Sequence, residues 1–194
     1  MTSEEAQFAQ EMNQARMNIK TTTKRQSNLS DEEISYMGIA AEILAARELG
    51  CWCDPFPYKG GDCHQGDLWK GEVSISLKSR GPFVDPDFLC PPGQVPEHFV
   101  DDYGVVARWV KRYSLLRLEG YFNRDDWAQH KTLIHPSKNN PQLRPGIPHT
   151  VLRPIEELKE ILDAIPTTTV PSLAAYRHLA DIRNGNHRTR STVS

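Results

Sequence analysis

One stretch decides the fold, Asp67-Leu68-Trp69-Lys70-Gly71-Glu72-Val73-Ser74-Ile75-Ser76-Leu77-Lys78. Its alternating apolar and polar residues predict two strands joined by a tight Lys70-Gly71 turn, with Leu68 opposite Val73 and Asp67 opposite Ser74. Side chains alternate between the two faces of a strand. The apolar face then holds Leu68, Val73, Ile75 and Leu77, and the polar face holds Asp67, Ser74, Ser76 and Lys78. A carboxylate and a lysine are therefore expected to point the same way from adjacent strands.

A helix is predicted just upstream, over residues 30–49. Ser30 and Glu33 match a capping box, and Gly50 is a good C-terminal stop. Apolar residues recur behind the cap at helical spacing. They are Ile34, Met37, Ala41, Leu44 and Ala45. This helix also carries Glu42, close in sequence to the hairpin.

The remaining elements give a mixed α/β order. Strands are predicted over residues 51–53, 105–110 and 114–122, a short helix after 123, an amphipathic helix over 154–165 and a last helix over 172–183. Residues 81–98 and 136–149 are rich in proline and are expected to be loops. We therefore expect a polar N-terminal segment (1–29), one domain (30–165) with a central mixed sheet flanked by helices, and a C-terminal helix with a basic tail (166–194).

Composition limits the classes of function. Of the 194 residues 38% are hydrophobic and 25% charged, which is enough apolar material for one core. No apolar run is long enough to span a bilayer or is flanked like a signal peptide, so a soluble, cytoplasmic protein is expected. The formal net charge of −2 excludes a globally basic nucleic-acid binder but allows a local cationic groove.

Several of these residues resemble the motifs of a known superfamily. Gly38-x-x-x-Glu42 on a first helix, then Gly66-Asp67-Leu68, then Val73 to Lys78, is similar to the PD-(D/E)xK nucleases in their phage and bacterial forms. The resemblance is strongest over residues 30–80 and looser through 103–127. It implies a restriction-endonuclease-like core with the active site on the second and third strands of the sheet.

The resemblance also implies roles for individual residues. Asp67 matches the metal-binding aspartate, Lys78 the catalytic lysine, and Glu42 the acid that many members carry on the first helix. Ser76 stands where the second acid is expected, which is a departure from the pattern. Mg²⁺ prefers a few carboxylates and keeps several waters, so Asp67, Glu42 and the Leu77 carbonyl would suffice, with Mn²⁺ as an alternative.

The expected function is therefore metal-dependent DNA cleavage, of a homing, restriction, repair or junction-resolving type. Such enzymes act inside a phage-infected or bacterial cell and commonly as homodimers or larger homo-oligomers. The candidate DNA-binding residues are Arg80, Arg108, Lys111 and Arg112. Asp101 and Asp102 lie in loop-like sequence, where a solvated turn is the usual explanation.

Two alternatives remain open. Because Ser76 carries no charge, the chain could be a catalytically inactive nucleic-acid-binding member of the same fold. A small zinc-stabilised binding module is the other, with Cys51, Cys53, Cys63 and His64 as ligands. The spacing of these four is unusual for zinc, and Cys51 and Cys53 lie in a predicted strand where small buried hydrophobic residues are expected.

Overall fold

The computed structural model describes residues 1–19, 30–53, 66–81, 87–89, 99–111, 115–135 and 143–166. Its helices are α1 (Ser3–Ile19), α2 (Asp31–Leu49), α3 (Arg124–His130) and α4 (Ile155–Asp163), with a 3₁₀ turn, η1, at His149–Val151. Its strands are β1 (Trp52–Cys53), β2 (Leu68–Lys70), β3 (Val73–Arg80), β4 (Phe88–Leu89), β5 (Tyr103–Lys111), β6 (Leu115–Asn123), β7 (Thr132–Ile134) and β8 (Arg144–Ile147). The predicted helix at 172–183 lies outside the described residues.

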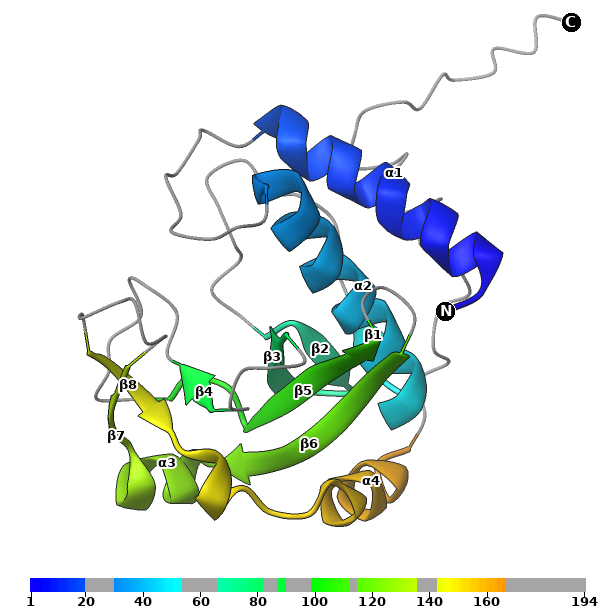
Figure 1. The fold of residues 1–194 in the computed structure, drawn as a ribbon. Helices are drawn as coiled ribbons and strands as arrows, with labels where there is room; N and C mark the ends of the chain where they lie inside the picture. The colour runs from blue at the N-terminus through cyan, green and yellow to red at the C-terminus, as the bar shows by residue number, and fades with distance from the viewer. Residues whose placement is uncertain are drawn as a thin grey trace, which may run out of the picture.

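These elements form a mixed α/β fold around a five-stranded sheet (Figure 1). The strand order is β1-β2-β3-β5-β6, in which β3 and β5 are parallel and the other neighbours antiparallel. A second sheet of three strands has the order β4-β8-β7. The mixed sheet flanked by helices is the class that the sequence predicts.

The helix α2 forms where its sequence predicts it. Ser30 accepts a hydrogen bond from the Glu33 amide, and the Glu33 side chain accepts one from the Ser30 amide, which completes the capping box. Gly50 ends the helix in the left-handed conformation, with φ of 61°. Because local hydrogen bonds close both ends, local sequence sets the limits of α2 along the chain.

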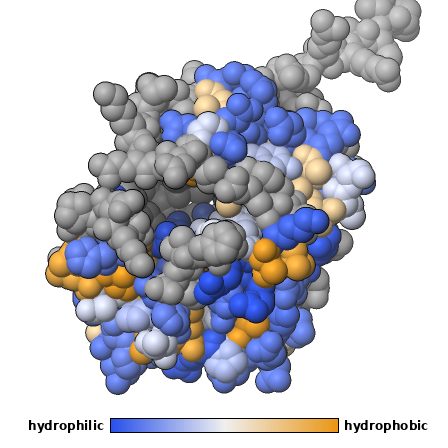
Figure 2. All heavy atoms as spheres, viewed as in Figure 1, coloured by the Kyte–Doolittle hydropathy of each residue, from blue (hydrophilic) through white to orange (hydrophobic). Residues whose placement is uncertain are grey.

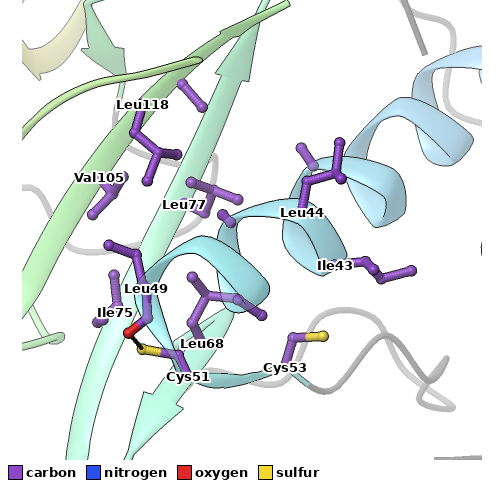
Figure 3. Packing of buried hydrophobic residues seen from close by; sticks show 14 of the residues in the cluster. Ile43, Leu44, Leu49, Cys51, Cys53, Leu68, Ile75, Leu77, Val105 and Leu118 are labelled. Atoms are coloured by element: carbon purple, nitrogen blue, oxygen red, sulfur yellow. Dashed lines mark hydrogen bonds between the residues drawn. The ribbon is translucent and has the colours of Figure 1, made fainter. Parts of the chain in front are cut away.

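The main core lies between α2 and one face of the large sheet. Leu44 and Leu49 of α2 point toward Leu68, Ile75 and Leu77 of the hairpin (Figure 3). All five side chains are buried. The apolar face of the hairpin is therefore the face that α2 covers.

The N-terminal segment forms a second helical layer. Figure 1 shows α1 on the far side of α2 from the sheet. Phe8, Ala9 and Met12 of α1 are buried in the main core cluster, and Arg47 of α2 pairs with Glu5 at 2.8 Å. The N-terminal segment, for which the sequence predicts only a polar stretch, thus forms a helix whose apolar side chains belong to the core.

An aromatic cluster covers part of the opposite face of the sheet. It joins side chains from β4, from the segment before β5, and from β5, β6, α3 and β8, namely Phe88, Phe99, Val106, Phe122, Trp127 and Ile147. The ring centroids of Phe88 and Phe122 are 4.7 Å apart in an edge-to-face arrangement. Such pairs stabilise a core beyond the area they bury. The small sheet and α3 are held to the large sheet by these rings.

Some large hydrophobic side chains are exposed among the described residues. The exposed large hydrophobic residues come from different elements and include Val110, Leu115, Leu133 and Ile161. Figure 2 shows apolar residues on the visible face as small patches in hydrophilic surroundings. None of the described helices combines the length and the apolar character needed to cross a membrane.

Candidate active site on the polar face of the hairpin

The β2–β3 hairpin has the expected faces but not the expected pairing. The strands are joined at Gly71-Glu72, with Gly71 at φ of 61°, and Leu68 pairs with Ile75 rather than with Val73. The predicted turn at Lys70-Gly71 is therefore wrong by one residue, and the pairing is shifted by two. A shift of two residues leaves every side chain on its original face, because strand side chains alternate with a period of two.

Asp67 is fixed at the start of β2. Its amide donates to the Ile75 carbonyl at 2.8 Å, which continues the hairpin pairing by one residue. Its carboxylate Oδ2 accepts from the Leu77 amide at 2.6 Å and from the Ser76 hydroxyl at 3.4 Å. Asp67 therefore stands beside Ser76, rather than opposite Ser74 as its sequence predicts, and is only half-buried.

Lys78 lies two residues after Ser76 on the same strand, so both side chains leave the same face of the sheet. Lys78 is half-buried. Its positive charge lowers the pKa of the Asp101 carboxyl. The structure thus brings Asp67, Ser76 and Lys78 together on the face opposite α2.

Asp101 is the residue that the sequence interpretation missed. A solvated turn was expected there, but the residue is 4% exposed and its Oδ1 accepts from the Gly66 amide at 2.9 Å. Burial raises the pKa of Asp101, while the Gly66 amide and the Ser74 hydroxyl oppose that shift. Asp67 raises the same pKa and Lys78 lowers it, so the three charged groups share one environment.

Glu42 sits in a different layer. Its helix, α2, packs on the Ile75 and Leu77 face, whereas Asp67 belongs to the opposite face. A Cβ built on Gly38 has none of the described atoms within 4 Å, so no close approach of α2 to the sheet depends on this glycine. The layering does not favour Glu42 as a partner of Asp67.

The Leu77 carbonyl is a predicted metal ligand, and its direction follows from the backbone of β3. A strand residue directs its amide and its carbonyl to the same side. Because the Leu77 amide donates to Asp67, the Leu77 carbonyl also faces the Asp67 side of β3. The carboxylates of Asp67 and Asp101 and the carbonyl of Leu77 are oxygen donors. Such a donor set suits Mg²⁺ or Mn²⁺, with water filling the remaining coordination positions. Within the described ranges, no three His, Cys, Asp or Glu side chains gather as a metal-binding group.

The predicted DNA-binding residues are differently placed. Arg80 donates through Nε and Nη2 to the Asp87 carbonyl, at 3.1 and 3.0 Å, and burial lowers its pKa. Arg108 pairs with Glu119 at 2.8 Å, and Lys111 is exposed at the end of β5. Arg80 therefore anchors the start of β4, and its role toward phosphate stays a prediction. Arg112 lies outside the described residues.

The cysteines that the structure describes are part of the core. Cys51 and Cys53 are buried in the main core cluster, as expected for small hydrophobic residues in a strand. Cys51 donates weakly to the Leu49 carbonyl at 3.5 Å (Figure 3), and burial raises its pKa to about 11. Cys63 and His64 lie outside the described residues.

Comparisons of the chain with protein families, with curated proteins and with solved structures gave no significant match.

Proposed function

We propose that the polar face of the β2–β3 hairpin is the active site of a metal-dependent DNA nuclease with a restriction-endonuclease-like core. One observation carries the proposal. Asp67, Ser76 and Lys78 leave the same face of adjacent strands, and Asp67 is hydrogen-bonded to the strand that carries Lys78. A carboxylate and an ammonium on one face of a hairpin are groups that phosphodiester hydrolysis uses.

Each residue has a definite task in this proposal. A bound divalent cation would neutralise charge on the phosphate and lower the pKa of the attacking water. Asp67 would hold that cation through the oxygen that does not accept from Leu77. Lys78 would place a point charge beside the phosphoryl oxygens as negative charge develops on them. Ser76 orients Asp67 by donating its hydroxyl proton toward Oδ2.

The proposed substrate has consequences for assembly and place of action. One such site cuts one strand of DNA, so cleavage of a duplex calls for two copies of the chain or two binding events. DNA as substrate also places the protein inside a bacterial or phage-infected cell. The described elements identify no surface for a second copy, so the homo-oligomer is part of the proposal.

Incubation with supercoiled, linear and branched DNA tests the proposal. Mg²⁺ or Mn²⁺ at millimolar concentration should support cleavage, and EDTA should stop it. We expect Mn²⁺ to be the better cation, because its affinity for oxygen and nitrogen sites is generally higher than that of Mg²⁺ and its geometry is less strict.

Two substitutions locate the activity. Asp67→Asn and Lys78→Met should each remove cleavage while the thermal unfolding transition remains, since neither side chain fills the core. Asn also retains an acceptor for the Leu77 amide. Glu72→Gln and Lys159→Met are the matched controls, because they remove the same charges at exposed or partly exposed positions away from the site. Cleavage that persists in Asp67→Asn would place the active site elsewhere or reveal a contaminant.

One observation favours a second function. Ser76 is neutral and 5% exposed, so the position that holds an acid in the similar nucleases carries no charge. The chain would then bind DNA without cutting it. A wild-type protein that shifts DNA in a gel but leaves every DNA form intact with either cation would support binding alone.

A further inference from the structure

We propose that Asp101 supplies the second carboxylate that Ser76 does not, and that Arg124 is its positioning residue. The inference rests on the proposed function, since both residues would act in the same site. In this arrangement the second acid comes from the segment before β5 instead of from β3 itself.

The position of Asp101 supports this role. Its Oδ1 accepts from the Gly66 amide, and Gly66 immediately precedes Asp67. The Asp101 carboxylate is thus bonded to the backbone that carries the first acid. A Cβ built on Gly66 would lie 3.2 Å from that same Oδ1 and 3.0 Å from the Ile75 amide nitrogen. Glycine at this position therefore allows the close approach of Asp101 to β3.

The surroundings of Asp101 contain both positive and negative charges. A buried carboxylate is costly unless neighbouring groups compensate it. Here the compensation includes the Gly66 amide and the nearby charge of Lys78, while the charge of Asp67 opposes it. Two acids and one lysine that influence one another electrostatically are the charges expected around a cation and a phosphate together.

The segment that carries Asp101 is clamped from two sides. On the α3 side, Arg124 donates from Nε to the Asp101 carbonyl at 3.0 Å and from Nη2 to the Val100 carbonyl at 2.6 Å. Its Nη2 also lies 3.2 Å from Asp102 Oδ1. The fork of a guanidinium can serve two carbonyls and a carboxylate at once, which an ammonium cannot do with the same geometry.

On the β3 side, Asp102 holds the segment to Ser74. Its Oδ2 accepts from the Ser74 amide at 2.9 Å, and its own amide donates to the Ser74 carbonyl at 3.1 Å. The clamp thus runs from α3 through Asp102 to the strand that carries Ser76 and Lys78. Arg124 touches the backbone of Asp101 and not its carboxylate, so it acts by placing that carboxylate.

The test is Mn²⁺ binding to the full chain without DNA, measured by isothermal titration calorimetry. Asp101→Asn keeps the acceptor for Gly66 and removes the charge, so Mn²⁺ affinity should fall by about tenfold or more. Arg124→Met should weaken Mn²⁺ by on the order of tenfold, in the range seen when a residue that orients a ligand is removed. Circular dichroism at the titration temperature confirms that each variant is folded.

Arg117→Met is the matched control. Arg117 is 62% exposed and Arg124 is 56% exposed, and each pairs with a carboxylate, but Arg117 binds Glu119 rather than the clamp. Its removal should leave Mn²⁺ affinity unchanged. If Arg124→Met does not fold, Asp102→Asn loosens the same clamp and should weaken Mn²⁺ in the same direction.

The outcomes separate this inference from the function on which it rests. Weak binding by Asp67→Asn with wild-type affinity in Asp101→Asn would overturn the role of Asp101 and leave the nuclease proposal standing. Equal losses in Arg124→Met and Arg117→Met would mean an effect that does not depend on the clamp and would overturn the role of Arg124. A wild-type chain that binds no Mn²⁺ would overturn the proposed function itself.

Discussion

The two faces of the large sheet are built from the same strands and are covered in different ways. Toward α2, β3 presents Ile75 and Leu77, which are buried among aliphatic side chains. Toward the other face the same strand presents Ser76 and Lys78, and the neighbouring strands continue that face as a cluster of aromatic rings. One face is therefore specialised for stability, and the other combines packing with charged groups that a stable core would avoid.

The largest loss of stability should come from the α2 face. Trp109 is fully buried there, so Trp109→Ala should lower the free energy of unfolding by about 3–5 kcal/mol. Its indole Nε1 has no hydrogen-bond partner among the described residues, so Trp109→Phe should cost much less. Urea unfolding of both variants measures the difference. Similar losses for Ala and Phe would show that the indole N–H is satisfied after all.

A smaller loss is expected on the aromatic face. A Cβ built on Gly104 would lie 2.1 Å from the Phe122 ring, which is itself packed against Phe88 and Trp127. Gly104→Ala should cost about 1–3 kcal/mol in the same unfolding experiment, because the ring has little room to move. The control is Gly38→Ala in α2, which should gain about 0.5–1 kcal/mol. A neutral Gly104→Ala would mean that the aromatic face is loosely packed.

The smallest effect should be a gain in stability at the polar face. Burial raises the pKa of Asp101 in the folded state. The protonated group therefore favours folding below its unfolded pKa of about 3.9. This contribution to stability is lost as pH rises through the higher folded pKa. At pH 7 the ionised carboxylate therefore destabilises the folded state, and Asp101→Asn should raise the melting temperature in metal-free buffer. The gain should shrink toward pH 4. A lower melting temperature at pH 7 would show that the charge of Asp101 is stabilising.

Local rules predicted the parts of this fold that are encoded locally. The capping box at Ser30 and the stop at Gly50 gave the limits of α2, and alternation gave the faces of β3 although the pairing of β2 was wrong. The strand β8 was missed, because Pro145 lies within it and proline is expected only at the edges of sheets. It is nevertheless the central strand of the small sheet.

The candidate site was predicted only in part, because only some of its contacts are local in the sequence. Asp67 and Lys78 are 11 positions apart in one hairpin, so alternation alone relates them. Asp101 reaches Gly66 across 35 positions, through the crossover that makes β3 and β5 parallel. No local pattern encodes that contact. A signal was present in Asp101 and Asp102 standing immediately before a predicted strand, but their position beside β3 depends on the tertiary fold.

The most direct test of the account is paramagnetic broadening of backbone amide resonances by substoichiometric Mn²⁺. If the polar face of the hairpin holds the cation, the amides of Gly66, Leu77 and Asp101 should broaden first. Those of Phe8 and Met12 in α1, beyond α2, should broaden last. The Asp67→Asn variant should lose the selective broadening. Broadening centred on any other part of the chain, or unchanged by Asp67→Asn, would contradict the assignment of this face as the site.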